Sequence, residues 1–157
     1  MATVNETNVR ETIAKFYEAL SRRDISMLAA VVTDDWEYIP EPIGAARGPS
    51  KMVAVFDDIA SALPDMEIEI LDILTHENRV GVRAVITGTQ HGPILGIEAT
   101  SKDIRFSIHS FHELRDQRIA KTWHLEDWLS VFQQLGRLPP LTSSWQPHHS
   151  LPTDVTL

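Results

Sequence analysis

The prevailing hydrophobic period of this sequence changes at Pro64-Asp65, and that change constrains the fold most strongly. Before it, apolar residues recur at spacings of three and four, which is typical of amphipathic helices that pack one face on a core. After it, apolar and polar residues alternate, which is typical of half-buried β-strands. Helices followed by a run of strands predict an α+β fold rather than a parallel α/β fold.

Three helices are expected before the change of period. The first covers about residues 6–21. Its apolar stripe consists of Val9, Ile13, Phe16, Tyr17 and Leu20. Asp24 is the expected N-cap of a short second helix. A short strand around Trp36 and Tyr38 follows, and a third helix begins near Pro49, a residue that the first helical turn tolerates.

Four strands and a last helix are expected after the change. Residues 66–70 and 80–86 predict a hairpin, and two further strands are expected around residues 104–108 and 119–125. A short helix then covers residues 128–135. We therefore expect a cone: a curved antiparallel, partly mixed sheet with the three earlier helices on its concave face, enclosing an apolar pocket.

Charge and composition restrict the classes of partner and chemistry. The chain has 14 basic and 22 acidic residues, a net charge of -8, which argues against nucleic acid and anionic membrane partners. Without cysteine it can form neither a catalytic thiolate nor a disulfide. No phosphate-binding loop, serine-hydrolase elbow, zinc-protease motif or dinucleotide fingerprint is present. No cofactor is therefore expected, and the preferred ligand is a small, mostly apolar molecule.

The two ends of the chain give further expectations. The N-terminus lacks the basic and apolar regions of a signal peptide, and no apolar run approaches the roughly 18 residues of a membrane span, so a cytoplasmic protein is expected. Residues 1–138 are expected to form the cone domain. Residues 139–157 are a proline-rich extension, expected to dock through Trp145 on a neighbouring subunit, with the pocket mouth or a crystal contact as alternatives. His148 and His149 would lie at solvent or an interface.

Residues 88–136 contain several local motifs in a fixed order. They are Gly88-Thr89-Gln90-His91-Gly92, residues 96–102, Arg118-Ile119, residues 123–127 and Gln134-Leu135-Gly136. This segment resembles the SnoaL-like polyketide cyclase (ester cyclase) group of the nuclear-transport-factor-two-like superfamily, and the N-terminal half agrees with it in layout. The resemblance implies a cone, also called cystatin-like, a homodimer formed through the sheet and a cofactor-free site.

The resemblance also implies a reaction and positions for its catalytic residues. Cyclases of this group close a ring by an intramolecular aldol reaction, with an aspartate on the last strand and a histidine and a glutamine on the strand before it. The matching positions hold His124, Ser110 and Ile108, so none of the three family residues is kept. His124 is the candidate catalytic residue, because an imidazole can take up and return a proton near neutral pH. Its alternative role is that of a buried structural histidine.

The alternation of side chains along a strand assigns the other candidate residues to its inner or outer face. Thr122, His124 and Glu126 share one face of the last strand, whereas Asp127 lies where the strand ends and would either orient the His124 ring or cap the next helix. On the preceding strand Ile108, Ser110 and His112 face inward. His109 faces outward, so it cannot share a metal ion with His112, and no metal is expected.

Four further residues complete the candidate site, and two of them, Gln90 and His91, lie near the expected pocket mouth. Gln90 is the inward hydrogen-bonding candidate, and His91 either closes the mouth or holds the adjacent loop. Trp36 and Tyr38 either stack on a planar ligand or form core wall.

Three functional hypotheses remain open. The leading one is a cofactor-free cyclase, isomerase, hydrolase or lyase that acts on a small hydrophobic carbonyl compound, with His124 as base supported by Asp127 or Gln90. The second is a non-catalytic module for ligand binding or dimerisation, which a small pocket or a His124 held by two hydrogen bonds would favour. The third is a metal-dependent hydrolase.

Overall fold

The architecture is taken from a computed structural model, which describes residues 6–41 and 47–138. The elements up to residue 62 are α1 (Glu6–Arg22), α2 (Ile25–Val31), β1 (Val32–Ile39), the 3-10 turn η1 (Pro49–Lys51) and α3 (Met52–Ala62). The later ones are β2 (Glu67–His76), β3 (Arg79–Thr89), β4 (Asp103–Arg115), β5 (Arg118–Glu126) and α4 (Trp128–Gln134). This order confirms the expected α+β fold.

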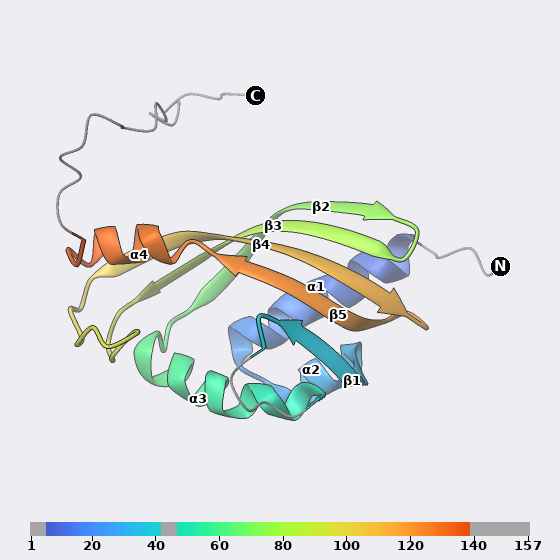
Figure 1. Cartoon of the computed structure of the whole chain (residues 1–157), viewed down its shortest axis with the longest axis horizontal. Coiled ribbons are helices and arrows are strands. Elements are labelled where there is room, and N and C mark those ends of the chain that lie inside the picture. Colours follow the sequence, from blue (N-terminus) through green and yellow to red (C-terminus); the bar gives the residue numbers. More distant parts are fainter. Residues whose placement is uncertain (1–5, 42–46, 139–157) are drawn as a thin grey trace, which may run out of the picture.

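The strands form one sheet with the order β1-β5-β4-β3-β2. All neighbours are antiparallel except β1, which runs parallel to β5 and forms one edge. The sheet arches over α1, α2 and α3, and α4 extends from the end of β5 (Figure 1). The three earlier helices therefore cover the concave face of a mixed sheet, as the sequence predicted, and leave its convex face uncovered.

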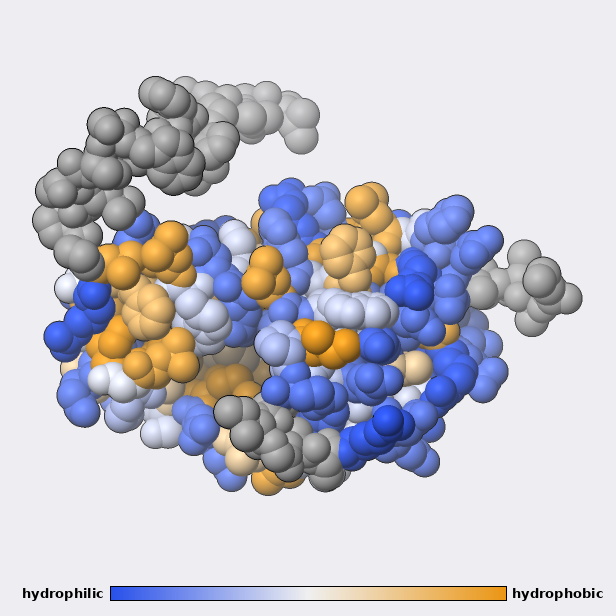
Figure 2. All heavy atoms as spheres, in the orientation of Figure 1, coloured by the Kyte–Doolittle hydropathy of each residue, from blue (hydrophilic) through white to orange (hydrophobic). Residues whose placement is uncertain are grey.

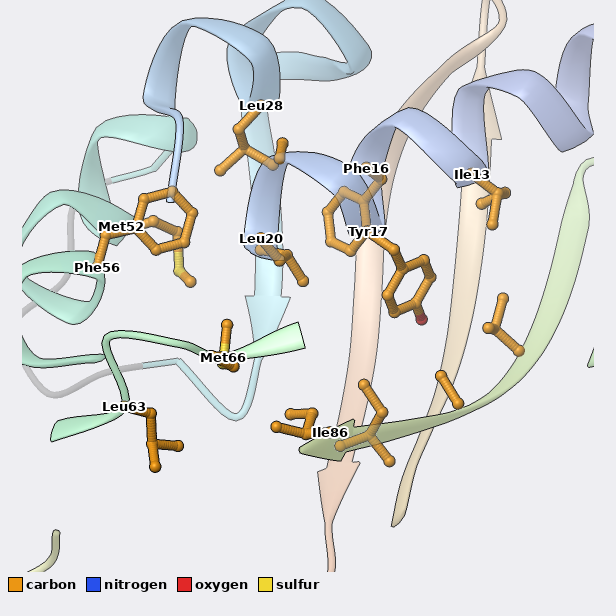
Figure 3. Packing of buried hydrophobic residues seen from close by; sticks show 14 of the residues in the cluster. Ile13, Phe16, Tyr17, Leu20, Leu28, Met52, Phe56, Leu63, Met66 and Ile86 are labelled. Atoms are coloured by element: carbon orange, nitrogen blue, oxygen red, sulfur yellow. The ribbon is translucent and has the colours of Figure 1, made fainter. Parts of the chain in front are cut away.

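The core fills the space between α1 and the sheet. The predicted apolar stripe of α1 is buried, and Asp24 caps α2 by accepting a hydrogen bond from the amide of Met27 (2.9 Å). Phe16 makes edge-on contacts with the rings of Tyr17 (5.3 Å between centroids) and Trp36 (5.9 Å). Figure 3 shows Phe16 and Tyr17 extending from α1, with the Tyr17 hydroxyl directed toward the strands.

A buried lysine joins the end of β1 to the start of α3. The Nζ of Lys51 donates to the Trp36 carbonyl oxygen (2.9 Å) and to the Glu41 carboxylate (2.7 Å), and its side chain has no solvent exposure. Gly48 precedes it at a φ of +86°, where a Cβ would overlap the Asp34 carbonyl oxygen, so only glycine fits. This connection places α3 beside the strand that carries the aromatic residues.

Two earlier expectations concern the C-terminal extension and membrane-spanning helices. The predicted extension at 139–157, with Trp145, His148 and His149, lies outside the described residues. Among the helices that are described, none is long and apolar enough to cross a bilayer.

Candidate functional site

The inner face of β4 and β5 brings the predicted site residues together. Their antiparallel register places Ser110 opposite His124, Ile108 opposite Glu126 and His112 opposite Thr122. Ile108, Ser110 and His112 are buried, with exposed fractions of at most 1%. Sequence alternation therefore identified the correct face of both strands.

His124 is held at both ring nitrogens. Its Nδ1 lies 2.8 Å from the Ser110 hydroxyl oxygen, and its Nε2 lies 3.1 Å from Oε1 of Glu126. The side chain of His124 is 7% exposed and that of Glu126 is 24% exposed. The carboxylate is therefore the member of this pair that is more accessible from solvent.

Of the two roles that the sequence offered for Asp127, the structure shows the helix cap, and the carboxylate beside His124 belongs to Glu126. Asp127 caps α4: its Oδ1 accepts from the amide of Ser130 (3.0 Å) and its Oδ2 from the Ser130 hydroxyl (2.6 Å). Glu126 contacts the imidazole instead, because residues two apart on a strand share a face. The i, i+2 spacing was the signal that could have assigned this role to Glu126.

A second polar cluster lies deeper in the core, around His112. Its Nε2 is 3.1 Å from the Tyr17 hydroxyl and its Nδ1 is 3.1 Å from Oγ1 of Thr122, which accepts a hydrogen bond from the Trp36 indole (3.0 Å). Sequence reasoning placed Tyr17 in an apolar helix stripe and assigned Thr122 no role. No local pattern reveals these partners, because Tyr17 and His112 are 95 positions apart.

Burial fixes the charge of these deep groups. Desolvation, with a smaller contribution from His124, lowers the pKa of His112 to about 3, so this imidazole is neutral near pH 7. Burial raises the pKa of the Tyr17 phenol, and a hydrogen bond with the Ser110 side chain partly opposes that rise. Tyr17 therefore remains protonated, and its hydroxyl lies 3.1 Å from Nε2 of His112.

The aromatic residues of β1 lie over the same cluster. The Tyr38 ring is 5.2 Å from the His124 ring and 5.3 Å from that of Trp36. Burial and the nearby charge of Glu126 raise the pKa of Tyr38 well above its usual value, so its phenol stays protonated. Its hydroxyl has no hydrogen-bond partner among the residues that the structure describes. Trp36 is completely buried and forms core wall, whereas Tyr38 is only partly buried.

Gln90 is buried, as predicted, but its amide is fully used by the loop that follows it. Its Nε2 donates to the carbonyl oxygens of Gly92 (3.1 Å), Ile97 (3.1 Å) and Glu98 (3.2 Å). Its Oε1 accepts from the amide (3.2 Å) and hydroxyl (2.6 Å) of Thr100. The expectation that Gln90 offers hydrogen bonds to a ligand is corrected here, because the same amide holds residues 92–100.

The two other histidines near the candidate site lie at the surface. The side chain of His91 is exposed, and its backbone amide bonds to the Ala62 carbonyl (2.9 Å), which ties the loop to the end of α3. His109 is exposed on the convex face, opposite to His112. His109 and His112 therefore cannot bind one metal ion together, in agreement with the alternation argument.

Two concave features are visible at this end of the molecule. An open cavity of about 350 Å³ is lined by Gly96, Ile97, Glu98, Phe132, Arg137 and Leu138, between the loop at residues 92–100 and α4. Figure 2 shows a separate hollow, with hydrophobic residues at its floor, between the C-terminal end of β5 and α3. That end of β5 carries His124 and Glu126.

Comparisons with known proteins agree with the fold. The model of the SnoaL-like polyketide cyclase family matches residues 11–135. TsrD from Streptomyces laurentii is 24% identical with a TM-score of 0.78, over 86% of this chain and 99% of TsrD. IdmH from Streptomyces antibioticus, a proposed polyketide cyclase, is 26% identical with a TM-score of 0.72, over 82% of this chain and 98% of IdmH. No curated protein sequence matches significantly.

Proposed function

Because the chain belongs to the SnoaL-like polyketide cyclase family, we propose that it is a cofactor-free, cyclase-type enzyme that acts on a small hydrophobic carbonyl compound. The observation that carries this proposal is the pair His124 and Glu126, which lies on the inner sheet face and is joined at 3.1 Å. Catalytic acid–base groups need a partner that holds them in position and a face that a substrate can reach. The 24% exposure of the Glu126 side chain, at the end of β5, supports such access.

The chemistry that fits this pair is enolisation followed by carbon–carbon bond formation. The pair removes a proton from the carbon beside a carbonyl group, and the C–H electron pair shifts to form an enolate. The enolate carbon attacks a second carbonyl of the same molecule, which closes a ring and leaves an alkoxide. The pair then returns the proton to that alkoxide, so protons balance and no cofactor enters the reaction.

Tyr38 supplies a hydrogen-bond donor for the enolate oxygen in this scheme. Its phenol stays protonated and has no partner among the described residues, and its ring lies 5.2 Å from that of His124. A donor placed where negative charge develops lowers the barrier more in a dry site than in water. The site therefore combines a base, its orienting partner and an oxyanion donor.

Hydrogen exchange at a ketone tests the proposal without knowledge of the natural substrate. The probe is 2-tetralone, a small hydrophobic ketone, whose α-proton exchange in D2O is followed by NMR. We expect the wild type to accelerate exchange, and Glu126→Gln and His124→Ala each to reduce the acceleration by about 100-fold or more. His109→Ala and Asp127→Asn are matched controls that should retain it. Equal rates in Glu126→Gln and the wild type, or no wild-type acceleration, would contradict the proposal.

A second candidate function is ligand binding without reaction. Two observations favour it: both nitrogens of His124 have partners, and the amide of Gln90 is fully used within the protein. The same NMR samples separate the two functions. Chemical-shift changes of residues on β5 on addition of 2-tetralone, without enhanced exchange, would indicate a binding module.

A further inference from the structure

The part of β1 that carries Tyr38 is attached to the sheet on one side only. β1 forms an edge of the sheet (Figure 1), and after a register shift its residues 37–39 pair with residues 121–123 of β5. Its other side faces no further strand among the described residues. The carbonyl group of Trp36 and the amide of Tyr38 point to that side, so they need other partners.

Glu41 and Lys51 occupy this free edge of β1. Oε1 of Glu41 accepts a hydrogen bond from the Tyr38 amide (2.9 Å). Nζ of Lys51 donates to the Trp36 carbonyl oxygen (2.9 Å) and to both Oε1 (2.7 Å) and Oε2 (2.9 Å) of Glu41. The Trp36 carbonyl oxygen also accepts from the amide of Gly48 (3.1 Å). The two side chains thus take the place that a neighbouring strand would fill.

The ammonium group of Lys51 is fully used at this edge. Its three N–H groups match the three acceptors, one on Trp36 and two on Glu41, so none is left for a ligand. Nζ also lies 5.3 Å from the centre of the Trp36 ring, and the Lys51 side chain has no solvent exposure. Separating a buried ammonium from its counter-ion is costly, so the pair resists any displacement of the strand edge.

We propose that Glu41 and Lys51 are positioning residues that hold the Tyr38 phenol in its place at the candidate site. The Tyr38 ring lies 5.2 Å from the His124 ring and 5.3 Å from the Trp36 ring. The pair grips the backbone at both Trp36 and Tyr38, and therefore fixes the segment from which these rings extend. The bearing of this contact on catalysis rests on the proposed function, in which Tyr38 donates to the enolate oxygen.

The Tyr38 hydroxyl depends on its backbone for its position. It has no hydrogen-bond partner among the described residues, so only the strand and the packing of the ring hold it. An oxyanion donor acts at about 2.7–3.1 Å from the developing charge, and a misplacement of about 1 Å can cost about 100-fold in rate. Loss of the edge contacts should therefore lower the maximal rate and leave KM nearly unchanged, because the donor acts in the transition state.

Proton NMR measures the position of the Tyr38 ring without any substrate. The chain has two tyrosines, so Tyr38→Phe assigns the ring signals by subtraction. In the full-length wild type we expect a nuclear Overhauser effect between the rings of Tyr38 and His124. In Lys51→Met, which removes the ammonium group, we expect this effect to be lost. The contact between the rings of Phe16 and Tyr17 (5.3 Å) is the internal control and should persist.

The kinetics of 2-tetralone exchange test whether this position matters for the reaction. Lys51→Met should reduce the maximal exchange rate about 10-fold or more and change KM by less than about twofold. In the Tyr38→Phe background the same substitution should cause no further loss, because the donor is already absent. A merely structural role would instead give the same loss in both backgrounds.

Glu41→Gln is a second variant, which still decides if Lys51→Met does not fold. The amide keeps the shape of the carboxylate but leaves the buried ammonium without a counter-ion, so the Tyr38–His124 ring contact should again be lost. Glu18→Gln is the matched control: Glu18 is 44% exposed, against 38% for Glu41, and it pairs with Arg22 on α1. This control should change neither the ring contact nor the exchange rate.

The outcomes separate this inference from the proposed function. A wild type without the Tyr38–His124 ring contact, or a contact that persists in Lys51→Met and Glu41→Gln, would overturn the inference. Equal losses of rate with and without the Tyr38 hydroxyl would overturn it as well. If the contact is lost in these variants but the wild type never accelerates 2-tetralone exchange, the positioning role stands and the enzymatic proposal is refuted.

Discussion

Single residues in this core differ in whether they can carry charge, and burial decides the difference. His112 and Tyr17 have hydrogen-bond partners but no counter-ion, so their neutral forms are favoured. Lys51 is equally buried, yet its contact with the Glu41 carboxylate at 2.7 Å compensates an ammonium charge. Glu126 keeps partial access to solvent. Proton transfer is thus best assigned to the His124–Glu126 pair rather than to the deeper histidine.

The buried His112 should make the folded protein sensitive to acid. Its pKa is about 3 in the folded state and 6.5 without burial, so between these values the unfolded chain binds one more proton. Stability therefore falls as the pH falls below 6.5, by up to about 1.4 kcal/mol per pH unit. Urea unfolding measures this effect. Between about pH 7 and pH 5, the free energy of unfolding of His112→Gln should fall by about 2 kcal/mol less than that of the wild type. His109→Gln is the matched control, and equal losses in wild type and His112→Gln would contradict the expectation.

At the scale of elements, the sequence predicted those features that depend on residues close together along the chain. The local spacing of apolar residues predicted the helices and strands, and alternation placed Ser110, His112 and His124 on the inner face. The parallel pairing of β1 with β5 was not predicted, because it depends on contacts between distant segments. For the same reason Tyr17 was counted as apolar: its partner lies on β4. The sequence left two roles open for Asp127, and its bonds to Ser130 confirm the helix cap, which follows from local spacing.

The loop at residues 92–100 should depend on Gln90. Gln90→Glu keeps the shape of the side chain but replaces the donor of three hydrogen bonds by an oxygen that repels the same carbonyl groups. We expect a loss of at least about 2 kcal/mol in the free energy of unfolding, and about 1 kcal/mol for Thr100→Val, which removes one partner. Urea denaturation measures both, and hydrogen exchange should accelerate at amides 92–100. An unchanged Gln90→Glu variant would show that the loop is held by other contacts.

At the scale of the whole molecule, the uncovered face of the sheet carries an apolar row across all five strands. The register aligns Leu74, Gly81, Phe111, Trp123 and Ile39 as direct neighbours. Leu74 and Phe111 are 74% and 65% exposed, and nearby Leu125 is 72% exposed. Beside this row lie the ion pairs Arg79–Glu113 and Lys121–Glu37, so both signs of charge border it. A contiguous apolar patch with a polar rim is typical of a protein interface.

We propose that a second copy of this chain covers that row, as the resemblance to the family led us to expect. Two-fold symmetry places the same patch of each copy against the other, and adjacent charges of both signs make the border of the row self-complementary. Phe111→Lys introduces a charge at its centre and should weaken association at least about tenfold in sedimentation equilibrium. Leu129→Lys, at a 58% exposed position on α4, is the matched control and should leave association unchanged. A monomeric wild type, or a Phe111→Lys dimer as stable as the wild-type dimer, would contradict the proposal. If Phe111→Lys weakens the dimer but leaves 2-tetralone exchange normal, the site on the opposite face does not depend on assembly.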